Sequence, residues 1–122
     1  MYNPNLDEAK KAFSKAEGII EKSYAFTGEL KLLPLALQQL QKATKYAWEF
    51  QGEKKPKLLI DLEKINQNRK DSPLEFKRKE KLVICTKDYK TTIIDEKIIR
   101  KYLQKTKSYL QKCKKKTQHE KN

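Results

Sequence analysis

Few side chains in this sequence are suited to proton transfer or covalent chemistry, and they stand far apart. The single histidine, His119, lies three residues from the end, and the two cysteines are Cys85 and Cys113. A general base must be held against its substrate, and a thiol becomes nucleophilic beside a base or cation that stabilises the thiolate. One histidine and two cysteines are also too few for a metal centre. We therefore predict no catalytic residue, no metal and no cofactor, and two free thiols in a reducing cytoplasm.

The lysines and arginines form a larger group, and their chemistry is the binding of anions. Of the formal net charge of +13, little lies in residues 1–50, which carry 7 Lys or Arg against 6 Asp or Glu, whereas residues 101–122 carry 8 against 1. Arrays of this kind bind phosphate chains mainly by releasing counterions, without reading bases. The alternative is a solvated helix face with a solubilising tail. The candidate nucleic-acid-binding residues are Lys77, Arg78, Lys79, Lys81, Lys101, Lys105, Lys112, Lys114, Lys115 and Lys116.

Four aromatic residues are candidates for stacking on bases. Tyr102 and Tyr109 are seven positions apart, which places them on one apolar stripe of a helix, and Tyr46 and Trp48 stand among Leu and Ala. Aromatic residues at such positions usually pack in a core. We therefore predict that these rings are core residues.

The elements that must position these side chains begin with two helices. Apolar residues recur three or four apart from Asn5 to Gly28, with Asn5 as the cap and Gly28 as a left-handed stop. A second helix begins near Pro34, which suits a first turn, and ends at Gly52. Because the connection after Gly28 is short, we expect the two helices to be antiparallel.

The segment from Pro56 to Cys85 is predicted as two further helices. Pro56 can open a short third helix. Ser72 and Glu75 have the spacing of a capping box around Pro73, which favours a helix over residues 74–85. The run "LVICT" has the composition of a strand, but a lone strand without a partner is unstable. We therefore predict helix here.

The last helix is expected to open at Thr92 or Asp95, both of which are competent caps. Its apolar stripe ends at Cys113, and Lys and Gln cover its other side. Beyond that point no apolar residue remains to hold the chain against the body. We therefore predict one helical domain over residues 5–112 and a disordered basic tail over residues 113–122.

The beginning of the second helix carries more apolar residues than one stripe needs. A helix that is apolar beyond one stripe tends to be covered on more than one side, so we predict a dimer interface here. The longest uncharged run, residues 32–41, has 10 residues and is too short to span a bilayer, so we expect no membrane association. The predicted interface consists of Leu32, Leu33, Leu35, Ala36 and Leu37.

The helix order and the segments "LDEAKKAFSKAEGIIEKSYAF", "LALQQLQKATKYAWEFQG" and "IIDEKIIRKYLQKTKSYL" resemble the small helical HEPN proteins of prokaryotes, over residues 6–112. The resemblance implies a bundle that is commonly a homodimer and often pairs with a small nucleotidyltransferase as toxin and antitoxin. Ribonuclease members carry an Arg, four to six residues and then a His on a late helix. Arg69, Arg78 and Arg100 do not stand at that spacing before His119. This departure argues against nuclease activity.

Taken together, these patterns predict an all-α fold, a four- to five-helix up-and-down bundle with a frayed basic C-terminal tail. The first functional hypothesis is a non-catalytic interaction module that dimerises or docks a small protein partner. The second is RNA binding by the basic C-terminal half. The third is a divergent ribonuclease.

Overall fold

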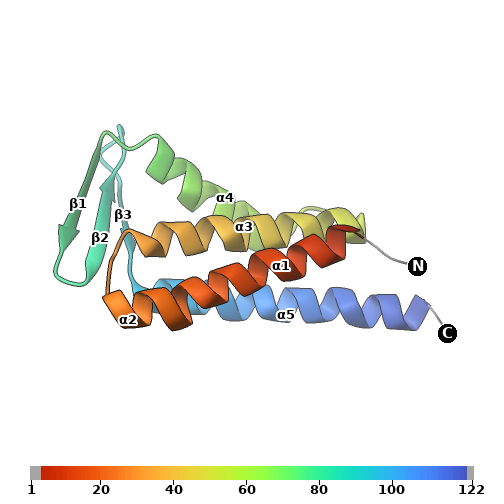
Figure 1. Ribbon diagram of the computed structural model, residues 1–122. Helices are drawn as coiled ribbons and strands as arrows, with labels where there is room; N and C mark the ends of the chain where they lie inside the picture. Colours follow the sequence, from red (N-terminus) through yellow and green to blue (C-terminus); the bar gives the residue numbers. More distant parts are fainter. Residues whose placement is uncertain (1–3, 121–122) are drawn as a thin grey trace.

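The computed structural model describes the backbone of residues 4–120 and the side chains of residues 5–114. Long helices run side by side along one axis, and a small antiparallel sheet lies across one end of them (Figure 1). The first helix begins and the last helix ends at the opposite end. The chain is therefore mostly helical, but it is not all-α as the sequence pattern predicted.

The first predicted helix is confirmed as one continuous helical segment with an irregular middle. It consists of α1 (Pro4–Gly18), a π-helical stretch η1 (Ile19–Tyr24) and α2 (Ala25–Thr27). Gly28 follows with φ +67°, a left-handed conformation that suits glycine and ends the helix. The fully buried residues of this segment share one stripe, as the period of 3.6 requires. They are Ala9, Ala16 and Ile20.

The second predicted helix is confirmed, and the third is present but longer than the short helix that the sequence pattern predicted. Helix α3 (Leu32–Gln51) is the central element, in contact with α1, α4 and α5, and it ends at Gly52, whose φ is +70°. Helix α4 (Lys57–Lys70) starts directly after Pro56, which is its N-cap. Helix α4 returns along α3 toward the sheet (Figure 1).

The last helix, α5 (Glu96–Glu120), begins after Asp95, one of the two predicted caps. The Asp95 Oδ1 atom accepts the Ile98 N–H at 2.9 Å, which satisfies one of the donors left over at a helix start. Cys113, which the sequence pattern placed in the tail, lies in α5 and is fully buried. The predicted domain boundary at residue 112 is therefore wrong for Cys113. The side chains from residue 115 onward lie outside the description.

The predicted helix over residues 74–85 is wrong. This stretch forms strands β1 (Leu74–Arg78) and β2 (Lys81–Cys85), and β3 (Thr91–Ile94) completes an antiparallel sheet in the order β1-β2-β3. The run "LVICT" has the partners that the sequence pattern did not identify, because β1 and β3 pair with its two edges. With both edges satisfied, the strand preference of its β-branched residues prevails over the capping signal.

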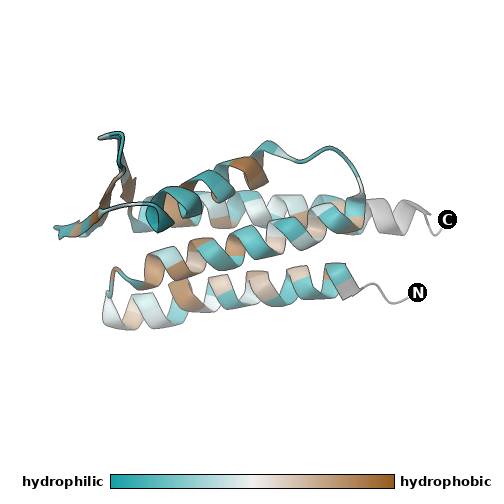
Figure 2. Cartoon of the chain, turned by 90° about the horizontal axis from the view of Figure 1, so that it is seen from above, coloured by the Kyte–Doolittle hydropathy of each residue, from teal (hydrophilic) through white to brown (hydrophobic). Residues whose placement is uncertain are grey.

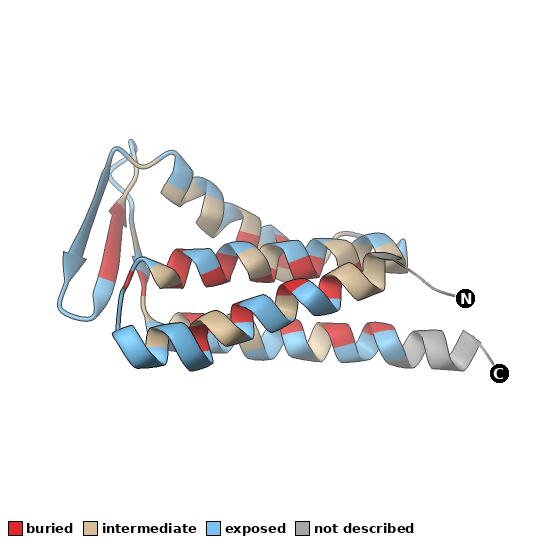
Figure 3. Ribbon diagram, viewed as in Figure 1, coloured by how far each residue is buried: buried red, intermediate tan, exposed pale blue. Residues whose placement is uncertain are grey.

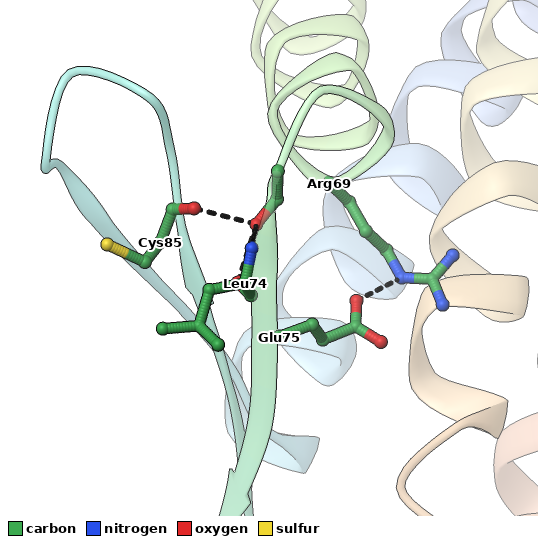
Figure 4. A network of polar contacts seen from close by, with 5 residues as sticks. Arg69, Leu74, Glu75 and Cys85 are labelled. Atoms are coloured by element: carbon green, nitrogen blue, oxygen red, sulfur yellow. Dashed lines mark hydrogen bonds and ion pairs between the residues drawn. The ribbon is translucent and has the colours of Figure 1, made fainter.

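The supposed capping residues have other partners in the folded chain. The Ser72 hydroxyl accepts the Leu74 N–H at 3.3 Å, only two residues on, and it also lies 2.7 Å from the Cys85 carbonyl oxygen across the sheet. Glu75, in place of reaching back to Ser72, accepts a hydrogen bond from Arg69 Nε at 2.9 Å (Figure 4). Ser72 therefore joins the ends of two strands, and Arg69 fixes β1 to the end of α4.

The main core lies where the sheet meets the helices. Leu82, Ile84 and Ile94 from the sheet pack with residues of α3, α4 and α5, and Figure 3 shows β2 buried while β1 is exposed along its length. A second cluster near the other end contains Ala9, Ala47, Leu110 and Cys113. Polar positions interrupt the apolar ones along each helix (Figure 2), and no helix of the described chain is long and apolar enough to cross a membrane.

Candidate functional site

The β1–β2 hairpin carries the first group of predicted basic residues. Lys77 and Arg78 end β1, Lys79 lies in the turn with φ +57°, and Lys81 begins β2. All four side chains are exposed. Among the side chains that the structure describes, none of these four forms an ion pair. The hairpin therefore presents four exposed cations, although Glu80, Asp95 and Glu96 line the same cavity as Lys81.

Two of these cations lie directly opposite each other. Arg78 pairs with Lys81 in the register of the hairpin. Opposed residues of an antiparallel pair have Cα atoms about 4.5–5.5 Å apart and their side chains on the same face. Like charges at this spacing destabilise the hairpin. A bound anion would offset that repulsion, so the pair is suited to a phosphate or carboxylate.

The register also assigns the apolar residues of the sheet to two faces. Leu82 pairs with Ile94, and both lie on the inner face against the helices. Val83 pairs with Phe76 on one side and Ile93 on the other, so these three form a row across the outer face. Because side chains alternate between faces along a strand, Arg78 and Lys81 lie on the outer face too. The row and the opposed cations therefore share one surface.

The outer row is open to solvent at its two ends and covered in the middle. Phe76 and Ile93 are each 43% exposed, and Val83, between them, is 8% exposed. Val83 is covered mainly because its two cross-strand neighbours flank it. Leu74, one register step from Phe76 on the same face, is 53% exposed. We refer to Phe76, Val83 and Ile93 as the outer row.

The sheet that carries the outer row is fixed in place by the contacts at its base. The Ser72 hydroxyl lies 2.6 Å from the Leu74 carbonyl oxygen and 2.7 Å from the Cys85 carbonyl oxygen. Because the hydroxyl has a single proton, it donates a hydrogen bond to one of these oxygens at a time. The ion pair between Arg69 and Glu75 attaches β1 to α4 (Figure 4). These contacts attach β1 to the end of α4 and join it to the end of β2.

The second predicted group of cations lies on α5. Lys101, Lys105, Lys112 and Lys114 are exposed, and the Lys105 ammonium lies 5.7 Å from the centroid of the Tyr102 ring. None of these four is in an ion pair within the described residues. Lys115 and Lys116 were also predicted to bind nucleic acid, but their side chains lie outside the part of the chain that the structure describes.

The structure does not combine the hairpin and the end of α5 into one patch. Lys81 lines a cavity of about 280 Å³ together with Lys97 in the first turn of α5, so the hairpin meets the start of that helix. With a rise of about 1.5 Å per residue, Lys114 lies about 25 Å farther along the axis. Lys101 and Lys105 lie between these positions. The cations therefore follow α5 away from the sheet as a discontinuous track.

Lys107 and Lys114 border a separate groove between α5 and α1. This groove has a volume of about 440 Å³, with Lys10 on the α1 side and Phe13 and Leu110 among its lining residues. Glu17 also lines it and partly offsets the three lysines. The groove extends the positive surface of α5 onto α1.

The predicted dimer interface is mostly interior. Leu33, Ala36 and Leu37 are fully buried in the main core, and Leu32 is half-buried. Leu35 remains 45% exposed. The apolar excess of this helix is covered on more than one side as expected, but by other elements of the same chain: α1 and η1, helices α4 and α5, and the sheet residues of the main core.

The thiols and the aromatic residues have structural roles. Burial raises the pKa of the Cys113 thiol, which keeps it protonated, and its Sγ lies 3.9 Å from the Ala47 carbonyl oxygen. Cys85 is half-buried and free. Tyr102 and Tyr109 pack against the two core clusters, as predicted. Within the described residues no three His, Cys, Asp or Glu side chains are grouped to hold a metal ion.

The outer row was not predicted from the sequence. The signal for it was the alternation of Leu74 and Phe76 with Glu75 and Lys77 in "LEFKR", together with the apolar run in "KLVIC" and the β-branched run "TTII". Comparison of the chain with protein-family models, curated proteins and solved structures finds no match. The function must therefore be inferred from the geometry of this chain.

Proposed function

We propose that this protein is a non-catalytic nucleic-acid-binding protein that holds a phosphate chain on the basic surface of the hairpin and α5. The observation that carries the proposal is the opposed pair Arg78 and Lys81, two exposed cations without a carboxylate partner among the described side chains. Exposed lysines along α5, none of which forms an ion pair within the described residues, add a discontinuous track that leads away from the hairpin. RNA is the nucleic acid that we propose.

Release of counterions gives this proposal a quantitative test. For a single strand, the logarithm of the binding constant falls with the logarithm of salt concentration by about 0.7 per neutralised phosphate. We expect a labelled single-stranded RNA to bind with such a salt dependence. The double variant R78Q/K81Q should lower the slope by about 1.4, because two contacts are lost.

A matched control separates a binding site from net charge. Lys11 and Lys55 are already in ion pairs with carboxylates of this chain. The variant K11Q/K55Q removes the same charge as R78Q/K81Q but leaves the hairpin unchanged. The proposal predicts a near wild-type slope for this control. Equal slopes in the two double variants, or affinity that does not depend on salt, would refute specific binding at the hairpin.

Docking of a protein partner is the second candidate, and the exposed outer row favours it. The HEPN resemblance leads us to propose a homodimer or a nucleotidyltransferase-like partner for such a surface. Two copies of a chain of charge +13 repel each other, which disfavours the homodimer at low salt. Sedimentation at high protein concentration tests it, and a monomer of 14.5 kDa would exclude self-association.

A further inference from the structure

We propose that the outer face of the sheet is a stacking site for the bases of a single-stranded nucleic acid, with Phe76 as the platform and Arg78 and Lys81 on the adjoining phosphate. This inference rests on the proposed function and names the class of nucleic acid. It depends on three observations: the exposed aromatic side chain, the apolar row to which it belongs, and the cation pair on the same face.

The first step concerns the ring. Phe76 is 43% exposed although its neighbours in the row are apolar, so the chain itself leaves a large part of this side chain open to solvent. Val83 and Ile93 continue the apolar surface across β2 and β3. A base has an apolar π-face of its own, and stacking on an aromatic side chain is tolerant of sequence.

The second step concerns distance. Arg78 follows Phe76 by two residues on the same strand, which is about 6.8 Å at a rise of about 3.4 Å per residue. Lys81 is directly opposite Arg78. Both side chains are long and flexible, and they reach a phosphate next to a base that is stacked on the ring. One nucleotide can therefore contact the ring and the cations together.

Four candidates could bind the outer face of the sheet: a duplex, a second copy of this chain, an acidic peptide or a single-stranded nucleic acid. A duplex hides the faces of its bases inside the stack, so it can use the cations but not the ring. A second copy of this chain would bring its own cations to the same face. An acidic peptide would match the cation pair, but the unpaired lysines continue along α5 well beyond the sheet. A flexible phosphate chain with exposed bases matches all of these features.

The test compares two single strands of equal length, an oligoadenylate and an abasic strand that has phosphates without bases. Wild-type protein is expected to prefer the oligoadenylate. The variant Phe76→Leu keeps an apolar side chain but removes the ring, and it should weaken oligoadenylate binding by about 5-fold or more. It should leave abasic-strand and duplex binding within about twofold, and it should not change the salt slope, because no charge is lost.

Two further variants make the result specific. Phe76→Trp retains a stacking surface and should restore the preference for bases. Phe26→Leu makes the same chemical change at an aromatic residue of α2 that is 92% exposed and lies outside the sheet. It should leave binding unchanged. An equal loss in Phe26→Leu and Phe76→Leu would overturn the assignment to the sheet face.

The outcomes also distinguish this inference from the function on which it rests. If no strand binds with a salt dependence, the proposed function fails and this inference fails with it. If strands bind with the expected slope but Phe76→Leu has no effect, the function stands and the stacking site is refuted. If Phe76→Leu dissociates a dimer, a second copy covers the face, and the stacking site is refuted as well.

A measurement on the wild-type protein keeps the test independent of folding in the variants. Ultraviolet crosslinking of a single-stranded oligonucleotide containing thiouridine should attach it to the peptide that contains Phe76. Crosslinks confined to α5 or to the α1–α5 groove would place the bases elsewhere and refute the proposal.

Discussion

Replacing Ile94 and Ile93 one at a time by alanine tests which face of β3 packs against the helices. They are adjacent in β3 but lie on opposite faces, and Ile94 is 1% exposed whereas Ile93 is 43% exposed. Ile94 contacts the main core, and Ile93 belongs to the outer row. If β3 is paired as described, the two substitutions should have very different effects on the free energy of unfolding.

The magnitudes follow from burial. Ile94→Ala removes buried carbon atoms and leaves a cavity, for which the cost is about 2–5 kcal/mol. Ile93→Ala leaves no closed cavity, and the half-exposed side chain contributes about 1 kcal/mol by burial. Both substitutions lose strand preference by a similar amount, so this contribution cancels in the comparison. We expect Ile94→Ala to be the more destabilising variant by about 2 kcal/mol.

Urea unfolding followed by circular dichroism measures this difference. With a slope of about 1–3 kcal/mol per molar urea, the midpoint of Ile94→Ala should lie about 0.7–2 M below that of Ile93→Ala. The slopes of the two variants must agree for the comparison to hold. Equal midpoints, or a lower midpoint for Ile93→Ala, would refute the assignment of Ile94 to the inner face and with it the location of the outer row.

Three further predictions concern the helices. Gly28→Ala should destabilise the fold by about 1–2 kcal/mol, because φ is +67° at this position. Gly18→Ala should stabilise the fold by about 0.5–1 kcal/mol, because φ is −62° there and the space around the residue is open. Thermal melts of the two variants should therefore shift in opposite directions. Burial raises the pKa of Tyr109 to about 12 from its ordinary value of 10. The stability that the buried phenol contributes is therefore fully present below pH 10 and is lost as the pH rises through 12. In Tyr109→Phe, the last step of a tyrosinate absorbance titration should be absent. Ending the chain before Cys113 should lower the melting temperature relative to a chain that ends after Lys114, because a fully buried side chain is removed; identical melts would show that this residue contributes little.

The long helices and their ends could be predicted from the sequence because the signals are local. Gly28 and Gly52 end helices in left-handed conformations, and Pro56 and Asp95 stand immediately before the helices that follow them. Each of these effects depends on the backbone of one residue and on hydrogen bonds within one turn. The apolar period along each helix is likewise visible without knowledge of its neighbours.

The sheet could not be predicted in the same way, because a strand is stable only through its partners. The capping spacing of Ser72 and Glu75 was a genuine local signal, but in the fold Ser72 lies against the Cys85 carbonyl oxygen and Glu75 binds Arg69. Pairing of β2 with both β1 and β3 depends on segments that the turns bring together. Local preference for helix or strand is decided by such tertiary contacts.

The location of the proposed binding surface was also decided by tertiary structure. The sequence by itself determined a basic, mostly helical chain without clustered catalytic residues, and it identified the cations of the hairpin and α5. It did not determine that Leu33 and Leu37 are covered by the chain's own sheet and helices, or that Phe76 is left uncovered. The face on which a strand residue lies follows from register and from what packs on each side of the sheet, and both depend on residues distant in sequence.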